Sequence, residues 1–280
     1  MITVKPYGGL GNRIRVLYSV IGINREVGHE IKILWGCGRD LNCPFDELFI
    51  HPDNCRVRNF EQGLVKSVYE FSLRKLRFSK LRPYIYDLVL TKNKILEIKN
   101  ETDDFLALFK NHSSIYLESC ISFYEGAKIE DLLTIHPDIL NRAEKIFRRF
   151  ESPTYGIHIR GTDNQLSKKY SPPAVFENFI RKKIEEEGSA RFFLATDSKE
   201  VESEFINIFG ERIFTSNNKI LDRNSRQGIK NALVDMVCLS RTKKVYGSYF
   251  SSFSSISAML SGIECENVTI DSFDHGGDDI

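Results

Sequence analysis

The feature that most constrains the fold is an alternation of short apolar runs with longer amphipathic stretches. Strand-like runs occupy residues 2–6, 31–35, 114–118, 155–160, 191–196, 212–215, 243–247 and 267–270. Helical periodicity fills residues 12–27, 137–150, 173–187, 199–209, 228–241 and 252–262. Strands that alternate with amphipathic helices are typical of βα units built around parallel sheets. The pattern therefore predicts an α/β protein.

The length of 280 residues predicts two domains, because it exceeds the usual size of one. A boundary fits at Glu151-Ser152-Pro153, after which the alternation is more regular. We expect one domain at residues 1–150 and a second at residues 151–280, each Rossmann-like, with a cleft between them. Residues 36–112 carry little pattern, although a basic stretch near residues 64–82 suggests a helix.

Charge and composition exclude several classes of function. The 39 basic and 38 acidic residues leave a net charge of +1, so no global field would attract nucleic acid. The basic stretch Arg74–Arg82 is better explained as a solvated helix face than as a lipid-binding surface, so we expect at most peripheral membrane contact. No signal peptide or membrane-spanning run is visible, and the six scattered cysteines form no C-x-x-C pair. These features predict a cytoplasmic protein with reduced thiols.

Polar residues follow a strand-like run at His158-Ile159-Arg160-Gly161-Thr162-Asp163-Asn164. In open parallel sheets, ligands bind beyond the carboxyl ends of the strands. Strand alternation places His158 and Arg160 on one face. The planar guanidinium of Arg160 suits a diphosphate, because it gives paired charge-assisted bonds to phosphate oxygens. An ion pair between Arg160 and Asp163 that fixes the loop is an equally good explanation.

Two aspartates extend this interpretation. Asp197 closes the strand-like run 191–196, where Asp197 or Ser198 could also simply cap the next helix. Asp235 lies within the apolar segment Leu233–Leu239. A buried carboxylate needs a partner, and it can accept the two adjacent N–H donors of guanine. A salt bridge to a neighbouring arginine would serve Asp235 equally well.

Two glycine-containing segments link a strand to a helix. Gly247–Ser255 brings Ser251 and Ser252 to a predicted helix start, where N–H groups and hydroxyls can bind an anion or form an ordinary cap. Gly8-Gly9-Leu10-Gly11-Asn12-Arg13 permits either a close backbone approach to a ligand or a plain tight turn. It is not a dinucleotide fingerprint, because Ile14 stands at the third glycine position, and it is not a Walker loop. The sequence also lacks H-E-x-x-H, G-x-S-x-G and D-x-D motifs.

Taken in order, these segments resemble the α1,6-fucosyltransferases, a group that includes the rhizobial nodulation enzymes. Gly156–Asp163 is similar to their H-[VI]-R-R-T-D segment, and Phe193–Asp197 to their second motif. Leu233–Ser240, followed by Ser251-Ser252-Phe253-Ser254, is similar to their third motif. Gly8–Asn12 also resembles the opening glycine loop of the related α1,2-fucosyltransferases. The resemblance covers residues 155–262 well and residues 36–112 poorly.

The resemblance implies a two-domain GT-B fold and inverting transfer of fucose from GDP-β-L-fucose to a glycan hydroxyl, with no metal or other cofactor. An acceptor-side domain would precede a C-terminal domain that binds the GDP-sugar. His158 and Asp235 would contact guanine, Arg160 the β-phosphate, and Ser251 or Ser252 the diphosphate. Asp197 would support the site, and Arg160 and Asp197 would be its catalytic residues. The loop residues Gly9, Gly11 and Asn12 would also contact the nucleotide.

One departure separates the chain from this family, because Gly161 stands where a second arginine is usual. The general base should be a carboxylate in the N-terminal half, for which Asp40 and Glu47 are weak candidates. A non-catalytic module that binds GDP-sugars or nucleotides is the main alternative. A Rossmann oxidoreductase is disfavoured, because the glycine fingerprint fails at Ile14 and again at Leu41.

Overall fold

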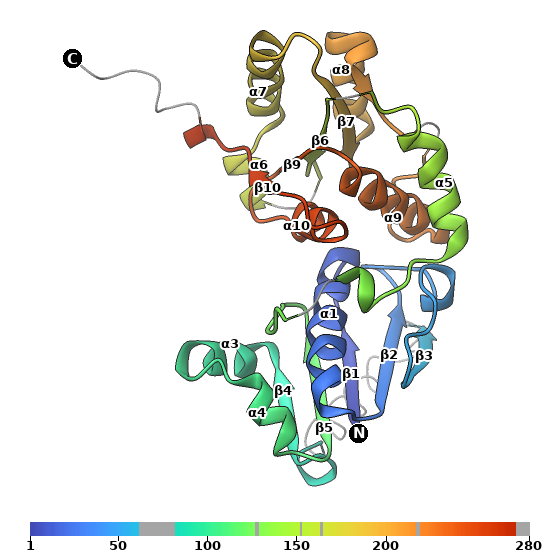
Figure 1. Cartoon of the computed structure of the whole chain (residues 1–280), viewed down its shortest axis with the longest axis vertical. Helices are drawn as coiled ribbons and strands as arrows, with labels where there is room; N and C mark the ends of the chain where they lie inside the picture. The colour runs from blue at the N-terminus through green and yellow to red at the C-terminus, as the bar shows by residue number, and fades with distance from the viewer. Residues whose placement is uncertain (62–81, 127–128, 152, 163–164, 217–218, 273–280) are drawn as a thin grey trace, which may run out of the picture. The chain divides into compact units, whose positions relative to one another are not determined.

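The computed structural model describes residues 1–61, 82–126, 129–151, 153–162, 165–216 and 219–272. The chain divides into two compact units (Figure 1). The first unit contains Met1–His136 together with Arg223–Ile229, and the second contains Pro137–Asp222 and Lys230–Ile280. The basic stretch predicted as a helix near residues 64–82 lies, up to residue 81, outside the described residues.

The first unit is built on a five-stranded parallel sheet with strand order β3-β2-β1-β5-β4. Its strands are β1 (Ile2–Pro6), β2 (Ile31–Cys37), β3 (Cys55–Glu61), β4 (Leu88–Thr91) and β5 (Ile115–Ser119). Its helices are α1 (Leu10–Val27), α3 (Lys92–Glu101) and α4 (Phe105–Lys110), with short 3-10 turns η1 (Phe45–Glu47) and η2 (Ile129–Asp131). The apolar face predicted for α1 is buried, as Ile14, Leu17 and Ile21 show.

The aromatic residue Trp35 at the end of β2 belongs to the core of the first unit. Its ring packs edge-on against Phe45 and Phe49, at centroid distances of 5.4 Å and 6.3 Å. The indole Nε1 donates a hydrogen bond of 2.8 Å to the carbonyl of Cys43. The segment after β2 is therefore a folded-back turn held by aromatic packing.

The second unit is built on another five-stranded parallel sheet, with strand order β10-β9-β6-β7-β8. Its strands are β6 (Thr154–Ile159), β7 (Arg191–Thr196), β8 (Ile213–Phe214), β9 (Val245–Gly247) and β10 (Cys265–Asn267). Its helices are α5 (Pro137–Phe147), α6 (Gln165–Tyr170), α7 (Pro173–Glu186), α8 (Lys199–Phe209), α9 (Arg226–Ser240) and α10 (Ser252–Met259), with 3-10 turns η3 (Gly210–Arg212) and η4 (Ile270–Ser272). The first residues of α9, up to Ile229, belong to the first unit. Phe176, Phe192 and Phe205 lie among the side chains that pack α7, β7 and α8 into one core.

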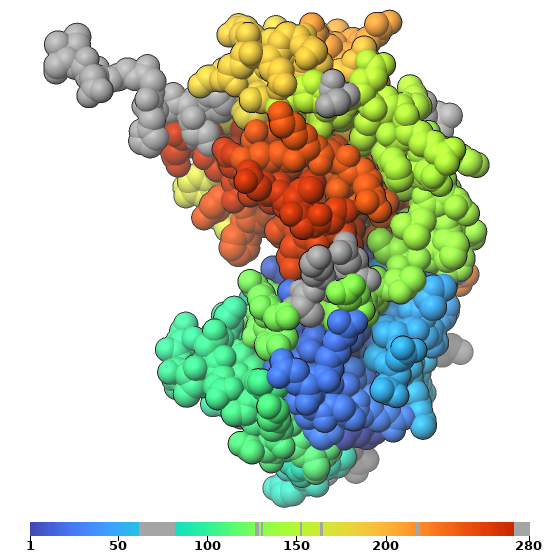
Figure 2. All heavy atoms as spheres, in the orientation of Figure 1, coloured from blue at the N-terminus to red at the C-terminus, as the bar shows by residue number. Residues whose placement is uncertain are grey.

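Helix α5 packs in the second unit, beside α9 (Figures 1 and 2). The Cys238 thiol on α9 contacts the Ala143 carbonyl on α5 at 3.7 Å. The Arg241 guanidinium lies 5.7 Å from the centre of the Phe147 ring. The structure divides at His136 and Pro137, before α5, and also places Arg223–Ile229 in the first unit, so its division differs from the predicted boundary at residues 150 and 151.

The predicted α/β architecture with parallel sheets is confirmed. Every predicted strand and helix outside residues 36–112 has a counterpart, but the last strand is displaced: it was expected at residues 267–270 and lies at Cys265–Asn267. The η4 turn follows at Ile270–Ser272. Strand β10 is exposed along its length, so it carries no apolar run from which its position could be read.

Across the described residues, none of the helices combines the length and the apolar character needed to cross a membrane.

Candidate functional site

The second sheet reverses its strand order between β6 and β9. The chain passes from β6 outward to β7 and β8, and then returns to add β9 and β10 on the other side of β6. His158 on β6 lies in register with Gly247 on β9. In sheets of this topology, ligands bind in the crevice outside the carboxyl ends of the strands at the reversal. The polar segments after β6 and after β9 meet at this position.

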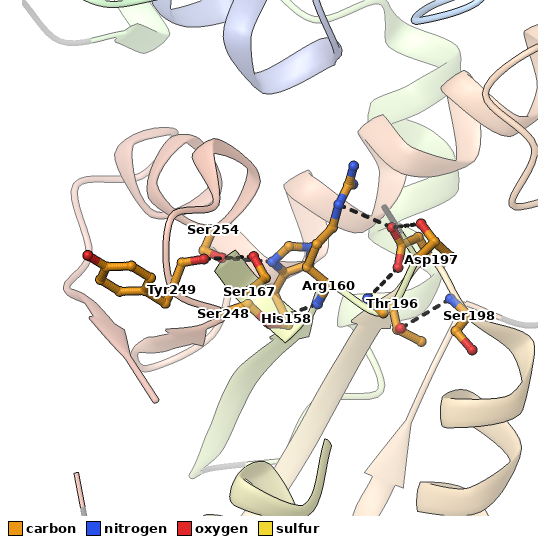
Figure 3. A network of polar contacts seen from close by, with 11 residues as sticks. His158, Arg160, Ser167, Thr196, Asp197, Ser198, Ser248, Tyr249 and Ser254 are labelled. Atoms are coloured by element: carbon orange, nitrogen blue, oxygen red, sulfur yellow. Dashed lines mark hydrogen bonds and ion pairs between the residues drawn. The ribbon is translucent and has the colours of Figure 1, made fainter. Parts of the chain in front are cut away.

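Ser248 joins the two segments (Figure 3). It is fully buried, and its backbone N–H donates to the His158 carbonyl at 3.0 Å. Its hydroxyl accepts a hydrogen bond of 2.9 Å from the backbone N–H of Arg160. Beside it, the hydroxyl of Ser167 on α6 donates to the Tyr249 carbonyl at 2.7 Å. The backbone that presents Arg160 is thus fixed from the neighbouring strand.

His158 is buried between β6 and α10. Its ring stacks on Phe253 at a centroid distance of 4.5 Å, and its Nδ1 lies 2.7 Å from the Ser254 hydroxyl. Burial, reinforced by the positive charge of Arg160, lowers the pKa of His158 from 6.5 to about 3. The imidazole is therefore neutral near pH 7, with one nitrogen that donates and one that accepts.

Arg160 forms an ion pair with Asp197, in which Nε lies 3.2 Å from Oδ2. The two side chains are 19% and 16% exposed, so the pair lies at the surface of the site. Figure 3 shows Arg160 reaching beyond the strand end with Asp197 beside it. The alternative pairing of Arg160 with Asp163 falls on a residue outside the described ranges.

Asp197 also organises the loop after β6. Its Oδ1 accepts the backbone N–H of Gly161 at 2.7 Å, and its Oδ2 accepts the Thr162 hydroxyl at 2.7 Å. Ser198 caps α8 instead, since its hydroxyl accepts the Val201 N–H at 3.2 Å. Of the two residues predicted to cap this helix, Ser198 does so, and the Asp197 carboxylate is directed at the loop after β6.

Gly161 packs closely against the start of α8. A Cβ atom at this position would lie 3.0 Å from the Ser198 Cβ, tighter than ordinary van der Waals contact. The backbone N–H of Gly161 is already committed to Asp197. The resemblance leads one to expect a second arginine at position 161. The space beside Gly161 is instead occupied by the start of α8.

Asp235 is buried on α9, with 4% of its surface exposed. Its carboxylate accepts the Ser216 hydroxyl and lies 3.1 Å from the ammonium of Lys219. Lys219 also forms an ion pair of 2.8 Å with Glu202 on α8. The predicted salt-bridge alternative is therefore realised with a lysine in place of an arginine.

Ser251 and Ser252 lie at the start of α10, as predicted. Ser251 is the N-cap residue and has extended backbone angles, but its side chain makes no capping hydrogen bond. The preceding residue, Phe250, has a φ of +57°, in the left-handed region that few side chains adopt. Strain at a single residue beside a ligand site is a recurrent feature of functional loops.

The remaining predicted site residues belong to the first unit. Gly9 is the N-cap residue of α1, and Gly11 and Asn12 fall in its first turn. Gly8 has a φ of +82°, so the tight turn predicted here is present. Asp40 is exposed in the turn after β2, and Glu47 forms an ion pair of 3.1 Å with Arg226.

Comparisons with known proteins support a particular fold. No protein-family model and no curated protein matches the chain. Among solved structures, NodZ alpha-1,6-fucosyltransferase from Bradyrhizobium, soaked with GDP-fucose, aligns over 92% of both chains with a TM-score of 0.61 and 17% identity. POFUT1 in complex with GDP aligns over 95% of this chain and 97% of its own, with a TM-score of 0.57 and 12% identity. A mutant of FUT1 from Arabidopsis thaliana in complex with GDP aligns over 95% of this chain and 69% of its own, with a TM-score of 0.59 and 12% identity. The chain has the fucosyltransferase fold.

Sharing the fucosyltransferase fold over more than nine-tenths of its length, the chain carries the predicted GT-B-like architecture. In its second unit, the structure brings His158, Arg160 and Asp197 together with Ser248 and Ser254. The positive charge of Lys219 also acts on this group, because it lowers the pKa of His158.

Sequence reasoning did not single out Ser216 and Lys219, and it included Ser248 only as part of the hydroxyl-rich segment Gly247–Ser255. Ser216 and Lys219 follow the predicted strand at residues 212–215, so the rule that placed Arg160 and Asp197 after strand ends would also have found them. Among the residues that the structure describes, no group of three or more His, Cys, Asp or Glu side chains is arranged to hold a metal ion.

Proposed function

We propose that the protein is an inverting, metal-independent glycosyltransferase that moves fucose from GDP-β-L-fucose to a glycan hydroxyl. The observation that carries the proposal is the pair Arg160 and Asp197 at the strand-order reversal, next to the neutral His158. The shared fold adds support, because NodZ has been soaked with GDP-fucose and POFUT1 has been solved with GDP.

In this proposal the second unit binds the donor. His158 and Asp235 contact guanine, and Arg160 contacts the β-phosphate. The N–H groups at the start of α10, with Ser251 or Ser252, add bonds to the diphosphate, since a helix start favours negative charge. We also propose nucleotide contacts for Gly9, Gly11 and Asn12, at the start of α1.

The chemistry needs a group that accepts the charge of the leaving nucleotide. The acceptor hydroxyl attacks the anomeric carbon opposite GDP, the bond from that carbon to the β-phosphate oxygen breaks, and the departing diphosphate gains negative charge. Arg160 stabilises this charge in place of a metal ion, while Asp197 fixes its direction. The proton of the acceptor hydroxyl passes to a carboxylate of the first unit, for which Asp40 and Glu47 are the candidates.

A non-catalytic module that binds GDP-sugars is the second candidate function. The observation that favours it is Gly161, which stands where a second arginine is expected. A Cβ atom added at this glycine would lie 3.0 Å from the Cβ of Ser198. Such a module would bind GDP and leave GDP-fucose intact.

We also propose the cytoplasm as the compartment. All six cysteines lie in the described residues and none of them is in a disulfide, which is compatible with a compartment that keeps thiols reduced.

The test is release of GDP from GDP-fucose and other GDP-sugars, measured against acceptors that end in galactose or N-acetylglucosamine. Arg160→Ala should lower kcat by about 10²–10³, the usual cost of losing one group that stabilises the transition-state charge. Arg181→Ala is the matched control, because Arg181 pairs with Glu177 on the exposed surface of α7. Full turnover by Arg160→Ala would refute the assignment, and GDP binding by a wild type that transfers to no acceptor would favour the module.

A further inference from the structure

The loop after β8 brings a lysine to the carboxylate that we propose reads guanine. The Lys219 ammonium lies 3.1 Å from Asp235 Oδ2 and 2.8 Å from Glu202 Oε2. Its side chain is 3% exposed, and those of Asp235 and Glu202 are 5% and 20% exposed. Two carboxylates from different helices therefore meet at one ammonium in a largely dehydrated environment.

This arrangement is held in place by α9. Asn231, one turn before Asp235, donates through Nδ2 to the Ile220 carbonyl at 3.2 Å. The Ser216 hydroxyl donates to Asp235 Oδ1. Both ends of the loop segment that carries Lys219 are thus bonded to one face of α9, which fixes the ammonium against Asp235.

Lys219 lies in contact with Asp235, whereas the cation of Arg142 on α5 is bonded one turn away, to the side chain of Asn231. Glu202 on α8 is a like charge, and the Cys238 thiol lies near Asp235 on α9 itself. On β6, His158 is held neutral, and Arg160 is paired with Asp197. Burial opposes the charged form of Lys219, but its two carboxylate partners outweigh burial and raise its pKa, so the ammonium stays charged.

Ionisation of Asp235 decides what the purine edge meets. A carboxylate accepts the N1–H and the 2-amino group of guanine together, with lone pairs that remain after Ser216 and Lys219 are bonded. A protonated carboxyl presents an O–H to the same edge and loses one of these contacts. Buried carboxyls beside a like charge take up protons at raised pH.

We propose that Lys219 is a positioning residue for base recognition: its ammonium pairs with the Asp235 carboxylate and keeps it aimed at the guanine edge. This inference rests on the proposed function. It assigns the role to a side chain that acts through Asp235 and does not itself contact the base.

The experiment measures the affinity for GDP by calorimetry between pH 6 and pH 8.5. Lys219→Met should bind GDP at least about tenfold more weakly than wild type at pH 6, because Asp235 takes up a proton. The loss should shrink as pH rises and Asp235 ionises again. Lys219→Arg should restore affinity with the pH dependence of the wild type, and Lys199→Met, on the exposed start of α8, should match the wild type throughout.

Three further measurements make the result decisive. Glu202→Gln added to Lys219→Met should move the recovery of binding to lower pH, because it removes the like charge. Asp235→Asn should bind weakly without the pH dependence of Lys219→Met. If Lys219→Met does not fold, Lys219→Gln, which keeps a polar side chain of similar length, should show the same pH-dependent loss.

A loss of affinity in the Lys219 variants that is equal at every pH would overturn the inference, because it would mean that the lysine serves only packing. Unchanged affinity would overturn it as well. A wild type that binds no GDP at any pH would instead refute the proposed function, on which the inference depends.

Discussion

At the scale of single residues, the site depends on a histidine that the fold keeps neutral. His158 is stacked on Phe253, bonded to Ser254 and close to the charge of Arg160. A cationic imidazole there would lie buried beside another cation. A neutral imidazole, whose Nδ1 is engaged by Ser254, keeps Nε2 as one hydrogen-bonding atom for the guanine contact that we propose.

The lowered pKa of His158 predicts a loss of stability in acid. The pKa falls from 6.5 to about 3 on folding, so below pH 6.5 the unfolded chain binds a proton that the folded residue does not. The stabilising contribution is complete above pH 6.5 and is lost as pH falls toward 3, at about 1.4 kcal/mol per pH unit. Urea unfolding of wild type and His158→Gln should show a difference that shrinks through this window. A difference that stays constant between pH 7 and pH 4 would contradict the argument.

At the scale of elements, α10 is seated directly on β9. A Cβ atom at Gly247 would lie 2.3 Å from the Cβ of Ser254 and 2.1 Å from its hydroxyl oxygen. The glycine therefore allows the helix to approach until Ser254 reaches His158 across the strand-order reversal. The helix start and the histidine are parts of one arrangement.

Gly247→Ala should disrupt that arrangement. The added methyl must displace the backbone of α10, which we expect to cost about 1–3 kcal/mol and to weaken the contact between Ser254 and His158. GDP affinity should fall along with the free energy of unfolding. Gly188→Ala is the matched control, because a Cβ atom there meets nothing within 4 Å. Equal stability and equal GDP affinity in the two variants would count against this close fit.

At the scale of the whole molecule, the sequence was most informative where strands are buried. β6 and β7 are buried along almost their whole length, and their apolar runs predicted both strands and the positions of Arg160 and Asp197 after them. β3 alternates between half-buried and exposed residues, and β4 has four residues, so neither strand was predicted. The domain boundary differed because α5 packs against α9, and the contact between Ala143 and Cys238 spans 95 residues of sequence, which local patterning does not contain.

The sequence predicted which residues belong to the candidate site better than it predicted which of them form ion pairs. Strand ends gave His158, Arg160 and Asp197, and the apolar stretch around Asp235 marked it as a carboxylate in need of a partner. That the partner is Lys219 depends on the path of the loop after β8, which no periodicity records. The close packing at Gly161 and Gly247 likewise depends on which helices lie over them.

The most direct test of the account is a crystal structure of the protein soaked with GDP. We expect the β-phosphate within hydrogen-bond distance of the Arg160 guanidinium, with the guanine edge on His158 and the Asp235 carboxylate. GDP bound at any other place, with Arg160 and Asp235 untouched, would contradict the account.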